Sequence, residues 1–268
     1  MKEKVTEFIK GAVLALLYIA IFVGVQTLLS LAGTYTAVEM GYDPYDSLVN
    51  ITGPISLFTS LISVCLLWGI YYIRGIRLKS VILTKSITIP DFACAFVMAI
   101  GMRVLTNVYM NWAEEISFLK ESIESAQESM NLDAATPYGA IVMVFAICVV
   151  APVFEEILFR GFIQSELKRA GGVIFAVTVQ GALFALAHLN LAQVIFTFVI
   201  GVILGFIYHK TRSIGITILI HMVFNCSVIL ELKDSEYTLI AVIFGILMVL
   251  LSLTLMLVLH RRRTEENI

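Results

Sequence analysis

The chain has 268 residues, of which 59% are hydrophobic and only 14% are charged, and its mean hydropathy is +0.94. A typical soluble domain has about 25% charged residues, so the composition excludes an ordinary soluble domain and indicates a protein surrounded by lipid bilayer. The net charge of −2 gives no excess of basic residues for binding nucleic acid, and no nucleic-acid partner is expected.

Eight windows are long and apolar enough to cross the hydrocarbon core, which takes about 20 residues of helix. They cover residues 8–32, 51–73, 90–112, 138–163, 171–189, 191–208, 214–230 and 237–259. The first window is too long for the apolar core of a signal peptide, about 7–15 residues, and is expected to be a retained helix. We therefore predict an all-α, polytopic membrane protein with about eight transmembrane helices. No repeat or second domain is apparent, so residues 1–268 are expected to form a single membrane domain.

Charged residues alternate from loop to loop. Lysines and arginines gather at residues 2–10, 74–85, 168–169, 210–212 and 261–263, whereas acidic residues dominate 39–46, 114–133 and 231–236. Cytoplasmic loops carry the excess of Lys and Arg. The pattern predicts a multi-pass protein of the cell membrane with both termini in the cytoplasm.

Residues 114–133 form the one long polar stretch between the predicted spans. Ile116, Leu119, Ile123 and Met130 are loosely spaced as on one face of a helix, which predicts an amphipathic helix on the outer surface. A solvated lid is the favoured interpretation, with partner binding as the alternative.

Three charged side chains lie within six residues of the fourth window, in APVFEEILFRGF (151–162). An ionised side chain near the bilayer centre costs at least about 2.5–3.5 kcal/mol, so Glu155, Glu156 and Arg160 require an explanation. Residues four apart share a helix face, which predicts a structural pair between Glu156 and Arg160. Glu155 lies about 100° around the helix from Glu156 and is predicted to be free for chemistry.

Two histidines and an asparagine lie in the later windows. Phe184 and His188 are four residues apart, as are His221 and Asn225. Counted along helices at 1.5 Å per residue, Glu155, His188, His221 and Asn225 lie at compatible depths. Two carboxylates, two histidines and an amide on three helices form a set typical of a hydrolytic or metal site.

The motifs E-E-x-x-x-R, F-x-x-x-H and H-x-x-x-N, in this order on successive apolar helices, resemble the CPBP family of intramembrane CAAX proteases and bacteriocin-processing enzymes, also called Abi. The motif residues are Glu155, Glu156, Arg160, Phe184, His188, His221 and Asn225, and the resemblance covers residues 138–230. It implies an eight-helix fold and an endopeptidase acting on membrane-associated or lipidated peptides or proteins, as the CAAX prenyl endopeptidases do.

The resemblance also implies roles. Glu155 and His188 would activate the attacking water, and His221 and Asn225 would stabilise the oxyanion, with Glu156, Arg160 and Phe184 as structural support. Alternatively, Glu155, His188 and His221 would hold a zinc ion and leave one position for water. The sequence does not separate the two mechanisms; two histidines and one glutamate favour the zinc enzyme.

Two non-enzymatic interpretations compete with the protease. The chain could be a membrane immunity or scaffold protein that keeps the fold, or its intramembrane charges could line a transport path. A transport path predicts charges spread through the membrane and inverted repeats, and no repeat is found. Arg103 lies outside the motifs and could pair with a motif carboxylate, meet a substrate carboxylate or extend to the outer interface.

Overall fold

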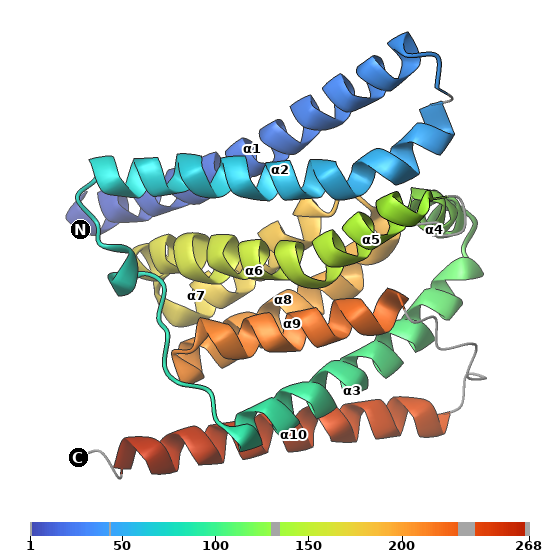
Figure 1. Cartoon of the computed structure of the whole chain (residues 1–268). Coiled ribbons are helices and arrows are strands. Elements are labelled where there is room, and N and C mark those ends of the chain that lie inside the picture. The colour runs from blue at the N-terminus through green and yellow to red at the C-terminus, as the bar shows by residue number, and fades with distance from the viewer. Residues whose placement is uncertain (1, 43, 130–134, 230–238, 266–268) are drawn as a thin grey trace.

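The computed structural model describes residues 2–42, 44–129, 135–229 and 239–265 (Figure 1). Within these ranges the chain is helical, with one isolated β-bridge between Thr84 and Ser213. The elements are α1 (Lys2–Glu39), α2 (Pro44–Ile73), η1 (Leu78–Ser80), α3 (Ile89–Glu114), α4 (Ser117–Ser129), α5 (Pro137–Phe145), η3 (Ala146–Val150), α6 (Ala151–Glu156), η4 (Ile157–Ile163), α7 (Gln164–Ala187), α8 (Leu191–Thr211), α9 (Ile214–Ile229) and α10 (Leu239–Glu265). The predicted all-α polytopic fold is confirmed.

Each predicted window corresponds to a described helix, although the fourth and fifth windows lie in one continuous helical stretch. Six stretches are long and apolar enough to span a membrane, and the shorter α9 is also apolar. One of the six, Pro137–Ala187, has 51 residues and is broken at Gly172, where φ is +83°. The rings of Phe159 and Phe184 lie only 5.0 Å apart, whereas 25 residues of straight helix would separate them by about 38 Å. The chain therefore turns back at Gly172, and this stretch makes two of the eight predicted passes.

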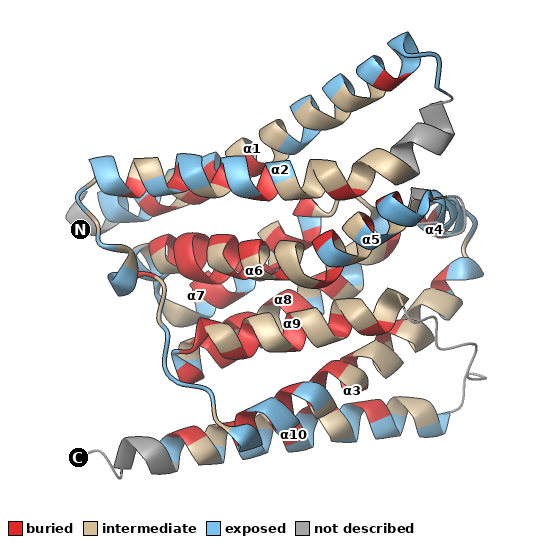
Figure 2. Ribbon diagram, viewed as in Figure 1, coloured by how far each residue is buried: buried red, intermediate tan, exposed pale blue. Residues whose placement is uncertain are grey.

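The helices pack into two apolar cores. One core joins α1, α2, α7 and the fourth pass through α6 and η4, and the other joins α3, α8, α9 and α10. Figure 1 shows α1 and α2 at one edge and α3 and α10 at the other, with α6 and α9 between them. Buried residues concentrate on the central helices, while the outer ones expose apolar side chains (Figure 2). Exposed leucine and isoleucine around the rim are expected of a bundle in lipid.

Charged contacts fix three helices at the end of the bundle that carries both termini. Arg74, which follows α2, donates to Glu166 of α7 and to the Tyr18 hydroxyl of α1, the latter at 2.7 Å. Tyr71 also donates to Glu166, at 2.8 Å. The hydrogen bond to Glu166 raises the pKa of Arg74, so the guanidinium stays charged.

Two close helix contacts set the spacing around the fourth and fifth passes. A Cβ added at Gly201 of α8 would lie 2.9 Å from the Cα of Gly181 in α7, and one added at Gly53 of α2 would lie 2.8 Å from the nitrogen of Met143 in α5. Small residues at such points let helix backbones approach each other in membranes.

Helix α4 confirms the predicted amphipathic helix of residues 114–133, and Met130 lies outside the described residues. Leu119 and Ile123 are buried against Ala113 and Ala192, while the opposite face carries the exposed charges. The Asn190 side chain, in the turn between α7 and α8, donates to the Ser122 carbonyl at 2.8 Å. Helix α4 is therefore attached to the turn that follows His188.

Candidate active site

The helix that carries Glu155 and Glu156 is interrupted on both sides by π-helical turns, η3 and η4. At the end of η3 the Ala151 amide donates to the Ala146 carbonyl, five residues back, rather than to Ile147. Pro152 follows and has no N–H to donate. The result is a six-residue α6 held between two wider turns, a geometry frequently found at functional sites.

Glu156 and Arg160 form the predicted pair, and both side chains are completely buried. Arg160 Nη1 lies 3.0 Å from Glu156 Oε1, but it lacks hydrogen-bond geometry, so charge attraction holds the pair. The guanidinium also stacks over the Phe184 ring, 4.7 Å from its centroid. A second guanidinium nitrogen donates to the Gly201 carbonyl at 3.4 Å. These contacts compensate for an arginine buried without water.

His221 lies between the two carboxylates, which spacing within α9 could not reveal. Its Nδ1 is 2.9 Å from Glu156 Oε1 and its Nε2 is 3.7 Å from Glu155 Oε2. Since a carboxylate accepts, the hydrogen on Nδ1 points to Glu156, and Nε2 faces Glu155. Glu156 therefore orients a histidine as well as pairing with Arg160, a wider role than the predicted structural one.

Phe184 and His188 share a face of α7, as their spacing predicted. His188 Nδ1 lies 2.9 Å from the Phe184 carbonyl oxygen. A carbonyl can only accept, so Nδ1 carries the hydrogen and Nε2 is left with a free lone pair. The Phe184 ring contacts His188 at 4.8 Å and His221 at 5.8 Å between ring centroids. One buried aromatic ring thus supports both histidines and Arg160.

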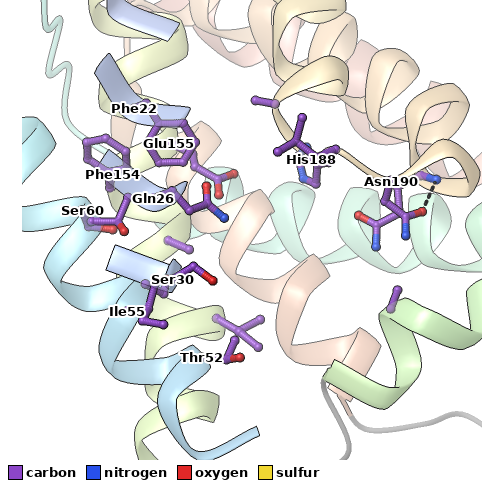
Figure 3. A pocket seen from close by; sticks show the side chains of 18 of the residues that line it. Phe22, Gln26, Ser30, Thr52, Ile55, Ser60, Phe154, Glu155, His188 and Asn190 are labelled. Atoms are coloured by element: carbon purple, nitrogen blue, oxygen red, sulfur yellow. Dashed lines mark hydrogen bonds between the residues drawn. The ribbon is translucent and has the colours of Figure 1, made fainter. Parts of the chain in front are cut away.

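Glu155 and His188 line one cavity of about 470 Å³, within the size range of small-ligand sites. Figure 3 shows Glu155 beside Gln26 of α1 and Ser60 of α2, with His188 across the cavity from them. The Glu155 side chain is 19% exposed, whereas that of Glu156 is 0% exposed. The accessible carboxylate is therefore Glu155. Ser125 and Ala126 of α4 line the same cavity, so the cavity extends toward the α4 end of the bundle.

Asn225 lies one helical turn beyond His221 and does not line this cavity. Its side-chain nitrogen donates at 3.0 Å to the carbonyl of Ile147, the acceptor that η3 and Pro152 leave without its usual backbone donor. One of the two amide hydrogens is thus used to satisfy the π-helical turn, and the other remains.

The predicted zinc ligands do not converge as a three-residue set. Glu155 and His221 are 3.7 Å apart, and His188 joins Glu155 on the cavity wall. Among the described residues, however, no three His, Cys, Asp or Glu side chains are grouped so that they could hold a metal ion. As placed, Glu155, His188 and His221 do not form a ready three-ligand site for zinc.

Some features of the site were not predicted. The hydroxyl and amide side chains of α1 and α2 that complete the cavity carry no motif, and the π-helical turns leave no sequence signal except Pro152.

Arg103 is half-buried on α3, and its Nε has no hydrogen-bond partner among the described residues. Within the described residues, Arg103 forms no ion pair with a motif carboxylate. It also does not line the cavity that contains Glu155.

The chain is an all-α membrane bundle in which Glu155 and His188 line one cavity and His221 lies beside Glu155. Residues 137–227 match the family model described as type II CAAX prenyl endopeptidase Rce1-like. This match contains all seven motif residues, and the expected resemblance to the intramembrane CAAX proteases is confirmed for this segment.

Similar proteins cover more limited parts of the chain. The membrane-embedded CAAX protease MroQ of Staphylococcus aureus is 33% identical over 33% of this chain and 38% of its own length. The UPF0177 protein in the abiGi 5′ region of Lactococcus lactis subsp. cremoris is 31% identical over 40% of this chain and 44% of its own length. UPF0177 protein YaiH of Lactococcus lactis subsp. lactis is 28% identical over 64% of this chain and 66% of its own length. No solved structure matches the chain. The chain spans about two fifths of the length of the first two relatives.

Proposed function

We propose that the protein is an intramembrane endopeptidase that hydrolyses peptide bonds of peptides or proteins at the membrane, including lipidated ones. The observation that carries the proposal is the placement of Glu155, 19% exposed, on a cavity wall with His188 and 3.7 Å from His221. The match of residues 137–227 to the CAAX endopeptidase model supports it.

In the proposed reaction a water molecule in the cavity attacks the carbonyl carbon of the scissile peptide bond. Glu155 takes a proton from that water, assisted by the free lone pair of His188 Nε2. The carbonyl becomes a tetrahedral oxyanion. When the intermediate collapses, the C–N bond breaks and Glu155 returns the proton to the leaving amine.

His221 and Asn225 are the proposed oxyanion donors. Asn225 would use its second amide hydrogen, because the Ile147 carbonyl accepts the first. His221 would donate Nε2–H in its doubly protonated form, since its Nδ1 hydrogen is held by Glu156. A well-placed oxyanion donor contributes about 3 kcal/mol to transition-state stabilisation. Glu156 acts through His221 and is a positioning residue.

The charged groups favour a hydrolytic site over a transport path. The motif side chains gather around one cavity and one α6–α9 contact instead of following a route across the bundle.

We also propose that both termini face the cytoplasm. In support of this membrane orientation, both ends of the described chain lie at the same end of the molecule (Figure 1).

The test is cleavage of an internally quenched peptide library by the purified protein in detergent. We expect Glu155→Ala, His188→Ala and His221→Ala to abolish cleavage while the protein accumulates normally. His209→Ala, at the end of α8 away from the cavity, is the control. Full activity in all three variants would refute the assignment. Phenotypic rescue of a null strain by Glu155→Gln would favour a non-catalytic immunity or scaffold role.

Two further arms refine the proposal. Preincubation with a chelator, followed by addition of zinc, tests the zinc enzyme: loss and zinc-specific recovery of activity would establish a metal, and unchanged activity would establish the metal-free route. Farnesylated and unmodified versions of the preferred peptide, compared by kcat/KM, determine whether a lipid contributes to recognition.

A further inference from the structure

The wall of the cavity opposite His188 is lined by polar side chains of α1 and α2. On α2 they are Thr52, Ser56, Thr59 and Ser60, and on α1 they are Gln26 and Ser30. Apart from the adjacent Thr59 and Ser60, neighbouring positions are three or four residues apart, so each helix turns one hydroxyl or amide face to the cavity. Figure 3 shows Ser60 near the level of Glu155 and Thr52 farther along α2.

Thr59 is the informative member of this wall. Hydroxyls in the spans usually bond to a carbonyl of their own helix, as Thr197 does with Gln193 at 2.6 Å and Thr211 with Ile207 at 2.8 Å. Thr59 is only 2% exposed, lines the cavity, and its hydroxyl has no hydrogen-bond partner in the described part of the chain. A buried hydroxyl without a partner is costly, so a ligand group that reaches the Thr59 hydroxyl from the cavity would offset that cost.

The polar face of α2 is held in fixed register with the helix of Glu155. Gly53 packs directly on the backbone at Met143, and Asn50 accepts hydrogen bonds from the Thr136 nitrogen and hydroxyl at 2.9 and 2.8 Å. Thr52 to Ser60 spans about 12 Å of helix. An extended peptide advances about 3.3 Å per residue, so this face matches about four residues of extended chain.

We propose that this wall binds the backbone of an extended substrate segment, about four residues long, that leads from the α4 end of the cavity to Glu155. The inference rests on the proposed protease function. A helical substrate must unwind before its peptide bond can be attacked, and its freed N–H and C=O groups then need partners where lipid offers none. Hydroxyl and amide groups supply both donors and acceptors, so the wall recognises chain conformation instead of particular side chains.

The experiment is a double-mutant cycle between the enzyme and the peptide. The best-cleaved library peptide is prepared with a single N-methyl amide at each of the four positions on either side of the scissile bond. Cleavage is measured for the wild-type protein, Thr59→Val and Ser60→Ala. Ser252→Ala is the matched control, because Ser252 is another buried hydroxyl without a partner but lies on α10 outside the cavity.

We expect Thr59→Val and Ser60→Ala each to raise KM about two- to tenfold, the effect of one neutral hydrogen bond, with kcat and the melting temperature little changed. N-methylation at the matching position should weaken cleavage by the wild-type protein and have a smaller effect on the variant. Ser252→Ala should behave as wild type. Additive effects of enzyme and peptide changes, or an unchanged KM in both variants, would overturn the proposal. Loss of the protease function itself would appear separately, as no difference between wild type and Glu155→Gln in the same assay.

Discussion

The buried Glu156–Arg160 pair gives a sharp test of how the site is built. Arg160→Met removes the cation and leaves Glu156 ionised in a completely buried position, 3.0 Å from where the charge was. Removing one partner of a buried pair costs about 3–5 kcal/mol. At about 2–4 °C per kcal/mol for a protein of this size, the melting temperature should fall by roughly 6–20 °C.

The double variant Glu156→Leu/Arg160→Met separates stability from activity. Replacing both charges with apolar side chains of similar size is often neutral, so most of the lost stability should return. Activity should not return, because His221 Nδ1 loses its acceptor at 2.9 Å, and loss of an orienting partner costs about 10–100-fold.

The measurements are thermal melting in detergent, folded yield and kcat on the preferred library peptide. Lys120→Met is the matched control, since the Lys120–Glu124 pair on α4 is 3.8 Å long with both side chains 58% exposed, and an exposed pair contributes about 0–1 kcal/mol. A wild-type melting temperature in Arg160→Met would refute the burial argument. A double variant with full activity would refute the role of Glu156 in orienting His221.

Three further substitutions test the surrounding framework. Gly201→Ala places a Cβ 2.9 Å from the facing α7 backbone and should lower the free energy of unfolding by about 1–3 kcal/mol, measured by thermal melting. Gly24→Ala, where nothing lies within 4 Å of the added Cβ, should be neutral or slightly stabilising. Equal effects of the two substitutions would contradict close packing at Gly201. Asn190→Ala removes the α8 N-cap and the contact to α4, so hydrogen exchange over 117–129 should rise. Glu121→Ala, at an exposed position of α4, should leave the exchange unchanged. Asn225→Ala leaves the π-helical carbonyl unsatisfied and should cost about 1–3 kcal/mol; an unchanged melting temperature would show that this hydrogen bond is dispensable.

The sequence predicted those contacts that depend on spacing within one helix. Glu156 and Arg160 pair as their spacing predicts, and Phe184 and His188 share a face for the same reason. Helical periodicity fixes such relations locally, so no knowledge of the tertiary fold is needed. Hydropathy likewise predicted the apolar helices, six stretches of which are long enough to span a membrane, because span length is set by the thickness of the bilayer.

Contacts between helices could not be predicted in the same way. Nothing within α9 indicates that His221 meets Glu156 through one nitrogen and faces Glu155 through the other. The hydroxyls of α2 resemble ordinary polar residues in an apolar helix until the cavity shows which face they share. The fit of zinc also depends on convergence of side chains from different helices, which ligand types alone do not establish, so the zinc site stays a prediction.

The π-helical turn η3 holds one residue more than a regular α-helix would need. Deleting one residue within Ala146–Val150 would let the turn become α-helical and leave the direction of Glu155 and Glu156 relative to α5 nearly unchanged. Deleting one residue from the regular α-helix α5 would instead rotate both carboxylates by about 100° relative to the start of α5. Both deletions would leave the hydrophobicity and all seven motif residues nearly unchanged, so a comparison of the two would separate the direction of the carboxylates from the composition of the helix.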